Sequence, residues 1–235
     1  MEKGTLYLIP CSIAENTTWD VLPRKVGTVI QSCKYFLAEN VRTSRRFISS
    51  LELGVAIEEL NFEELNKDTP PEHMEKLAQP LLKGHDMGIL SESGIPGVAD
   101  PGAKMVEYAH KKNIKVVPLS GPSSLILALA ASGLNGQKFA FKGYLPIEKD
   151  QREKAIKTLE KISSQHKETQ LFIETPYRNN QLLESLLATC RDETLLCVAK
   201  DVTGDQEDIR TLTIRQWKKQ TIDLHKIPTV FLLQG

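Results

Sequence analysis

Short apolar runs rich in β-branched and aromatic residues alternate with longer segments of helical spacing along this chain of 235 residues. In the first half, the runs predict strands over residues 5–9, 35–38, 55–58, 87–90 and 114–118, with helices over 23–32, 43–51, 70–82 and 103–111. This alternation is typical of βα units around a mostly parallel sheet. Residues 61–72 carry charges and two prolines without apolar periodicity, so we expect a surface loop there.

The pattern changes after a long apolar helix predicted over residues 124–132. Strands are expected over 139–144, 170–174, 195–199 and 229–233, and helices over 150–165, 179–190 and 213–219. The uneven spacing leaves a mixed and a parallel sheet equally open. We expect a domain boundary near Leu119, which gives an N-terminal α/β domain over residues 1–118 and a C-terminal α/β domain over 119–235.

Composition favours an ordinary globular protein, with 40% hydrophobic and 26% charged residues. Thirty basic and thirty acidic residues cancel, so any contact with RNA must come from local patches. The four cysteines lack paired spacing, which predicts reduced thiols and a cytoplasmic location. No apolar run is long enough for a signal peptide or a membrane span, so we expect a soluble protein without a membrane partner.

Several common chemistries lack their sequence signatures. There is no P-loop and no Gly-x-Gly-x-x-Gly after the first strand, which argues against nucleotide hydrolysis and nicotinamide chemistry. The sequence contains no Gly-x-Ser-x-Gly nucleophile elbow, which argues against acyl transfer. The five histidines are scattered, so no metal site is expected.

Two glycine-rich loops at predicted strand ends are the strongest candidates for a ligand site. Residues 91–102, SESGIPGVADPG, follow a strand and precede a helix, and loops in this position bind ligands in open α/β sheets. The alternative is a tight crossover turn. Residues 118–124, PLSGPSS, offer free amides at a helix start, and the alternative there is a helix N-cap by Ser120 or Ser123.

Two further strand ends combine a carboxylate with arginines. Glu39 precedes Arg42, Arg45 and Arg46, and Glu174 precedes Arg178. Such carboxylates can orient a substrate or accept a proton, and the arginines can hold a phosphate or carboxylate. The alternative for Arg45 and Arg46 is a pair of solvated side chains.

Four motifs in order give the chain a family resemblance: LSESGIPGVADPG at 90–102, VPLSGPSS at 117–124 with ASGL at 131–134, FAFKGYLP at 139–146 and IETPYR at 173–178. The chain resembles the tetrapyrrole methylase superfamily of S-adenosylmethionine-dependent methyltransferases, and within it the ribosomal RNA small subunit methyltransferase I branch. The resemblance implies an α/β fold of two αβα domains, with S-adenosylmethionine in the inter-domain cleft, and a homodimer.

The resemblance also implies site residues by position. The implied cofactor-binding residues come from strand ends and loops of both domains: Pro10, Ser91, Glu92, Ser93, Val98, Ala99, Ser123, Ser124, Glu174, Thr175, Pro176, Pro228 and Thr229. Arg42, Arg45 and Arg178 are the candidate substrate-binding residues. The acceptor in this branch is the ribose 2′-hydroxyl of a cytidine in small-subunit ribosomal RNA. Because its proton must leave, we expect a catalytic base, with Glu174, Glu39 and Asp201 as candidates in that order.

The chain departs from the branch pattern on the side expected to hold the acceptor. Glu39-Asn40-Val41-Arg42 stands where Glu-Asp-Thr-Arg is usual, and Lys200-Asp201-Val202-Thr203-Gly204 stands where Arg-Glu-Leu-Thr-Lys is usual. Two alternatives therefore stay open at this point. One is a methyltransferase acting on a tetrapyrrole or another small molecule, and the other is a cofactor-binding dimer without catalysis.

Overall fold

The computed structural model describes residues 2–235, and the chain divides into two compact units, Met1–Ser123 and Ser124–Gly235. Both this division and the predicted boundary near Leu119 lie between the end of β5 (Lys115–Pro118) and the start of α7 (Ser124–Ser132). Among residues 2–235, no helix combines the length and apolarity needed to cross a membrane.

The first unit contains a five-stranded sheet in the order β3-β2-β4-β1-β5. Every pairing is parallel, as the βα alternation predicts. The remaining strands are β1 (Thr5–Ile9), β2 (Tyr35–Ala38), β3 (Asn61–Glu64) and β4 (Met87–Leu90). Buried positions follow the alternation of a strand, because Phe36 packs into one hydrophobic cluster and its neighbour Leu37 into another.

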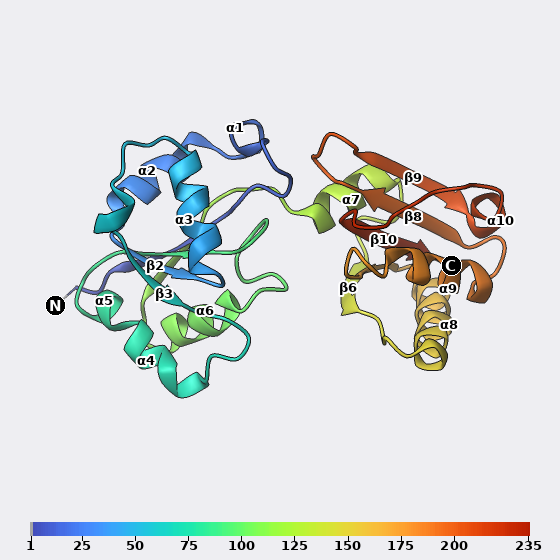
Figure 1. Ribbon diagram of the computed structural model, residues 1–235. Helices are drawn as coiled ribbons and strands as arrows, with labels where there is room; N and C mark the ends of the chain where they lie inside the picture. The colour runs from blue at the N-terminus through green and yellow to red at the C-terminus, as the bar shows by residue number, and fades with distance from the viewer. Residues whose placement is uncertain (1) are drawn as a thin grey trace. The chain divides into compact units, whose positions relative to one another are not determined.

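Helices cover both faces of this sheet (Figure 1). The helices α2 (Arg24–Ser32) and α3 (Val41–Ser50) pack with Phe36, and α4 (Met74–Leu77), α5 (Gln79–Leu82) and α6 (Gly102–Lys111) pack with Leu37. A short α1 (Thr18–Val21) and 3-10 turns over Ile57–Glu59 and Pro71–His73 complete the unit. The unit is therefore an αβα sandwich.

The first unit corrects three sequence expectations. The strand expected over residues 55–58 is wrong, because Val55 and Ile57 pack on the cluster beside α2 and α3 without joining the sheet. The loop expected over 61–72 contains β3, an edge strand whose pairing with β2 needs only backbone groups, so its side chains carry no apolar signal. The helix expected over 70–82 is split into a 3-10 turn, α4 and α5, and Pro80 lies at the start of α5.

The second unit contains a mixed five-stranded sheet in the order β6-β7-β10-β8-β9. Its strands are β6 (Phe139–Tyr144), β7 (Thr169–Ile173), β8 (Leu195–Lys200), β9 (Asp208–Thr213) and β10 (Thr229–Gln234). Only β6 and β7 pair in parallel. Sequence reasoning missed β9, an edge strand whose residues are all half-buried and mostly polar.

Helices again lie on both faces of the second sheet (Figure 1). The helices α8 (Lys149–His166), α9 (Asn179–Thr189) and α10 (Ile214–Trp217) pack with Phe172 and Phe231, and α7 packs with Leu171 and Leu232 on the opposite face. The helix α10 is shorter than the helix expected over 213–219. This unit is the second αβα sandwich.

Candidate functional site

Three strand ends lie side by side at one edge of the first sheet. Leu90 of β4 pairs with Ile9 of β1 on one side and with Ala38 of β2 on the other. The residues that follow are Pro10, Ser91 and Glu39, so the register brings them to the same edge. From β2 the chain continues to β3, and from β4 it continues to β5 at the opposite end of the strand order. A point where connections diverge in this way is where open α/β sheets bind ligands.

Ser91 shapes the predicted cofactor loop from within. Its side chain is buried, and its hydroxyl donates to the carbonyl oxygens of Gly94 at 3.1 Å and Ser93 at 3.3 Å. The amide of Cys11 also donates to the Gly94 carbonyl, at 2.9 Å. Gly94 has a φ of 71°, which suits glycine. These contacts leave Glu92 and Ser93 exposed on the outer side of the loop.

Asp100 fixes the second half of the same loop. Its Oδ1 accepts hydrogen bonds from the amides of Gly97 at 2.9 Å and Gly102 at 2.7 Å, and Gly102 begins α6. Ala99 adopts a φ of 55°, and Val98 is 52% exposed. The loop therefore presents Val98 and Ala99 to solvent on a backbone that Asp100 holds.

The carboxylates of Glu39, Glu92 and Asp100 lie near one another at these strand ends. Burial raises the pKa of Glu39, and the negative charges of Asp100 and Glu92 raise it further. Burial also raises the pKa of the Cys11 thiol to about 12, again with a contribution from Asp100. The edge is therefore electronegative and favours a ligand with positive charge.

The second glycine-rich loop packs against the end of β1. A Cβ atom on Gly121 would lie 2.2 Å from the Pro10 Cβ and 2.4 Å from its Cγ. Only glycine fits this contact, and the Leu119 amide donates to the Leu8 carbonyl at 3.0 Å, so the start of this loop also lies against β1. Pro10 itself is buried.

In the second unit, the sheet register gathers another group of predicted residues. Val230 pairs with Ile173, so the next position, Glu174, comes across from Thr229. Thr229 in turn pairs with Lys200, which precedes Asp201. Residues 174–176, 200–201 and 228–229 therefore share one edge of this sheet.

The Glu174 carboxylate is already engaged at this edge. Its Oε1 accepts hydrogen bonds from the Thr175 amide at 2.6 Å and from Arg178 Nη2 at 2.7 Å, and the Glu174 side chain is 2% exposed. The hydrogen bond to Glu174 raises the pKa of the Arg178 guanidinium. Arg178 Nε is buried without a hydrogen-bond partner among residues 2–235.

Asp201 stabilises the turn that follows β8. Its amide donates to the Pro228 carbonyl at 2.8 Å, and its Oδ2 accepts from the Gln206 amide at 2.8 Å. A Cβ on Gly204 would lie 2.3 Å from the Asp201 carboxylate. These contacts assign Asp201 a structural part in the turn.

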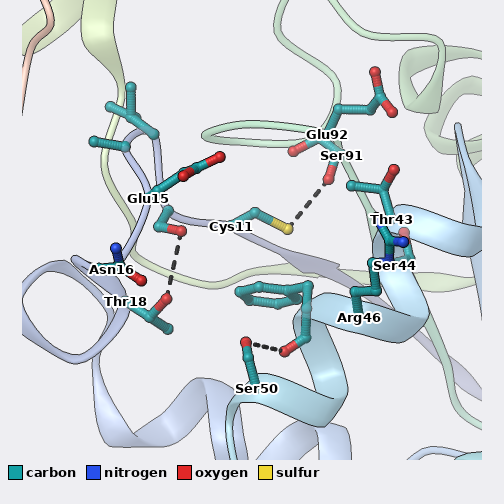
Figure 2. A pocket seen from close by; sticks show the side chains of 14 residues that line it. Cys11, Glu15, Asn16, Thr18, Thr43, Ser44, Arg46, Ser50, Ser91 and Glu92 are labelled. Carbon is teal, nitrogen blue, oxygen red and sulfur yellow. Dashed lines mark hydrogen bonds between the residues drawn. The ribbon is translucent and has the colours of Figure 1, made fainter. Parts of the chain in front are cut away.

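A cavity of about 470 Å³ opens beside the first sheet edge (Figure 2). Its wall is formed by the loop after β1, by the start of α1, by α3 and by the start of the loop after β4: Cys11, Ser12, Ile13, Ala14, Glu15, Asn16, Thr18, Thr43, Ser44, Arg46, Phe47, Ser50, Ser91 and Glu92. Sequence reasoning missed most of this set. The spacing of Thr43, Phe47 and Ser50 along one helical face was the available signal.

The α3 arginines diverge around the helix. Arg46 lines the cavity, whereas the Arg45 guanidinium lies 5.3 Å from the centre of the Phe62 ring. Arg42 is exposed and does not line the cavity. Asn40 caps the helix, because its Oδ1 accepts from the amides of Arg42 at 3.0 Å and Thr43 at 3.2 Å.

The structure thus groups the predicted cofactor residues within each unit. Pro10, Ser91, Glu92 and Ser93 lie at the edge of the first sheet, and Glu174 and Thr229 lie at the edge of the second. Ser123 ends the first unit and Ser124 begins the second.

Comparison with known proteins identifies the family. The sequence model of the Tetrapyrrole (Corrin/Porphyrin) Methylases matches residues 18–217. The chain belongs to this family. It is an S-adenosylmethionine-dependent methyltransferase, and its two αβα units, free of the common dinucleotide-binding fingerprint, agree with that assignment.

Two curated relatives carry the name Ribosomal RNA small subunit methyltransferase I. The protein from Halalkalibacterium halodurans is 31% identical over 92% of this chain and 70% of its own length. The protein from Escherichia coli O157:H7 is 26% identical over 99% of this chain and 78% of its own length. The crystal structure of the methyltransferase CobJ shares the fold, with a TM-score of 0.63 and 17% identity over 99% of this chain and 94% of that chain.

The residues at the first sheet edge fit the chemical groups of S-adenosylmethionine. Within residues 2–235, the amides of Glu92 and Ser93 donate to no protein acceptor, so they are free for a carboxylate. The carboxylates of Glu39 and Glu92 suit a ligand that carries an ammonium and a sulfonium. These amides and carboxylates therefore match the carboxylate, the ammonium and the cationic sulfur of S-adenosylmethionine.

Proposed function

We propose that this methyltransferase methylates a ribose 2′-hydroxyl of small-subunit ribosomal RNA. The observation that carries the proposal is the similarity, over nearly the whole chain, to relatives named for small-subunit ribosomal RNA methylation. The fold neighbour CobJ is 17% identical and supports the fold alone, so it lends no weight to a tetrapyrrole acceptor.

We propose cofactor-binding residues for S-adenosylmethionine in each unit, taken separately. In the first unit these are Pro10, Ser91, Glu92, Ser93, Val98, Ala99 and Ser123, and in the second Ser124, Glu174, Thr175, Pro176, Pro228 and Thr229. The free amides of Glu92 and Ser93 support this assignment, as does the electronegative edge. The bound cofactor supplies an activated methyl group on a sulfonium, so the protein's task is alignment and removal of the acceptor proton.

Three carboxylates are candidates for the catalytic base: Glu174, Glu39 and Asp201. Glu174 is paired with Arg178, and Asp201 holds its own turn. Glu39 has a raised pKa and no hydrogen-bond partner for its side chain among residues 2–235. A free carboxylate with a raised pKa accepts a proton from a hydroxyl more readily than a paired one. These contacts favour Glu39 as the base and Glu174 as a positioning residue.

Arg42, Arg45 and Arg178 are the proposed substrate contacts. The departure at Asn40 does not argue against an RNA acceptor, because asparagine and aspartate cap a helix equally well. The local structure that presents these α3 arginines is therefore retained.

We further propose a cytoplasmic homodimer. The four cysteines are free and buried, which fits a reducing compartment. The second unit exposes Ile126, Tyr144, Ile147 and Tyr177 to between 53% and 70%, and such side chains suit a protein interface. Light scattering at micromolar concentration tests the dimer, and a monomer mass would refute it.

Methylation mapping tests the proposed acceptor. Ribosomal RNA from cells lacking the gene should lose one ribose methylation in the small subunit, and an unchanged map would overturn the proposal. Calorimetric titration with S-adenosylmethionine provides the matched measurement of cofactor binding. Glu174→Ala should lower the rate of transfer and also raise the calorimetric Kd for S-adenosylmethionine, because Glu174 is a proposed cofactor contact. Loss of transfer with an unchanged Kd would instead make Glu174 the catalytic base.

A further inference from the structure

The cavity beside α3 shares one wall with the predicted cofactor loop and extends away from it. Ser91 and Glu92 belong to both, while the rest of the lining comes from the loop after β1, the start of α1 and α3 (Figure 2). An acceptor must contact the donor's methyl group, so its pocket must adjoin the donor loop in this way. The α3 side of the cavity contributes no residue to the proposed cofactor site.

The lining has the chemistry of a pocket for one nucleotide. Ser and Thr hydroxyls supply much of the wall, Phe47 offers an aromatic ring, and Arg46 supplies the only guanidinium. A volume of about 470 Å³ lies in the range of small-molecule pockets and accommodates a single nucleotide.

We propose that this cavity is the acceptor pocket, which takes one unstacked nucleotide of the RNA with Arg46 on its phosphate. The inference rests on the proposed function and names the residues that select its substrate. Unstacked nucleotides of single-stranded RNA are commonly recognised by aromatic stacking and by contacts to their edges. Glu15 provides an acceptor for an exocyclic amino group of the base, a pairing that carboxylates make with cytosine.

Arg46 is the residue of α3 best placed for this contact. Within residues 2–235 it forms no ion pair and no side-chain hydrogen bond, so its charge is free for a phosphate. Its neighbour Arg45 lies against Phe62 outside the cavity. Successive helical residues point about 100° apart, which separates the two side chains.

The test compares Arg46→Gln with a matched control, Arg24→Gln, in the full-length protein. Arg24 is an exposed arginine of the first unit that does not line the cavity. We expect Arg46→Gln to raise the KM for unmethylated small ribosomal subunits about tenfold, with kcat and the calorimetric Kd for S-adenosylmethionine within twofold of wild type. The slope of log affinity against log salt should fall by about 0.7 to 0.9, the value for one lost phosphate contact.

A second variant, Ser50→Trp, narrows the cavity from the end of α3 without changing charge. It should also raise the KM for the subunits and spare cofactor binding. If either variant weakens S-adenosylmethionine binding in parallel with the acceptor KM, the cavity belongs to the cofactor and the inference is wrong. If wild type is active and both variants match Arg24→Gln, the inference alone fails. If wild type methylates no small subunit while binding the cofactor, the proposed function fails and the inference falls with it.

Discussion

Replacing Asn40 tests how α3 is held at the candidate site. The Asn40 side chain accepts hydrogen bonds from the amides of Arg42 at 3.0 Å and Thr43 at 3.2 Å. A helix of 10 residues is marginal on its own, so its first turn depends on this cap and on packing. Asn40→Ala removes the acceptor and should cost about 1 kcal/mol of the free energy of unfolding. For a chain of this size, that corresponds to a fall in Tm of about 2–4 °C.

Asn40→Asp is the matched control and restores the residue usual in the resembled branch. It keeps the acceptor and gains about 0.3–1 kcal/mol from a negative charge at the helix N-terminus. Repulsion from the adjacent carboxylate of Glu39, whose pKa is already raised by its acidic neighbours, opposes that gain. We therefore expect Asn40→Asp to stay within about 0.5 kcal/mol of wild type.

The assay is urea unfolding followed by circular dichroism, with hydrogen exchange to localise the effect. In Asn40→Ala, the amides of Arg42 and Thr43 should exchange faster, while those of the second sheet should not change. An unchanged unfolding midpoint for Asn40→Ala would refute the reasoning. An equal loss of the free energy of unfolding in both variants would show that the side-chain NH2 group of Asn40, and not its oxygen, holds the helix.

Three further predictions concern the site and its supporting structure. Glu39→Gln should lower kcat about 100-fold or more, because general-base catalysis contributes that much. The kcat of wild type should fall as the pH drops through the raised pKa of Glu39. If Glu39→Gln keeps the same pH profile of kcat, Glu39 is not the base. Gly121→Ala should lower the free energy of unfolding by about 1–3 kcal/mol, because the new Cβ would lie 2.2 Å from the Pro10 Cβ. In the control Gly136→Ala, the new Cβ has open space around it, so the same denaturation experiment should show no change in the free energy of unfolding. Burial raises the pKa of the Cys11 thiol from 9.0 to about 12, so the folded state binds the thiol proton more tightly than the unfolded state. The free energy of unfolding should therefore decline as the pH rises above about 9. Cys11→Ala should lessen that decline.

The sequence alone determined the order of most helices and strands, since apolar periodicity depends on which side chains are buried. The strands over Thr5–Ile9, Tyr35–Ala38 and Met87–Leu90 match their predicted bounds, because each is buried between two helical layers. The glycine-rich loop over residues 91–102 was also visible, since its turns require glycines and prolines at fixed positions. The family followed from the ordered motifs.

Tertiary structure alone decided the edge strands and the state of the acidic groups. The strands β3 and β9 are stabilised by backbone hydrogen bonds to a neighbour, which leave no mark on side-chain periodicity. Likewise, Glu39 and Glu174 are each followed by an arginine within four positions, but only the folded loop decides that Glu174 pairs with Arg178 while the pKa of Glu39 is raised by burial. The cavity beside α3 depends on three segments brought together by the sheet register. Burial, strand pairing and cavities arise from contacts between residues distant in sequence. The local pattern therefore determines most helices and strands, and the assembled sheets determine which side chains share a site.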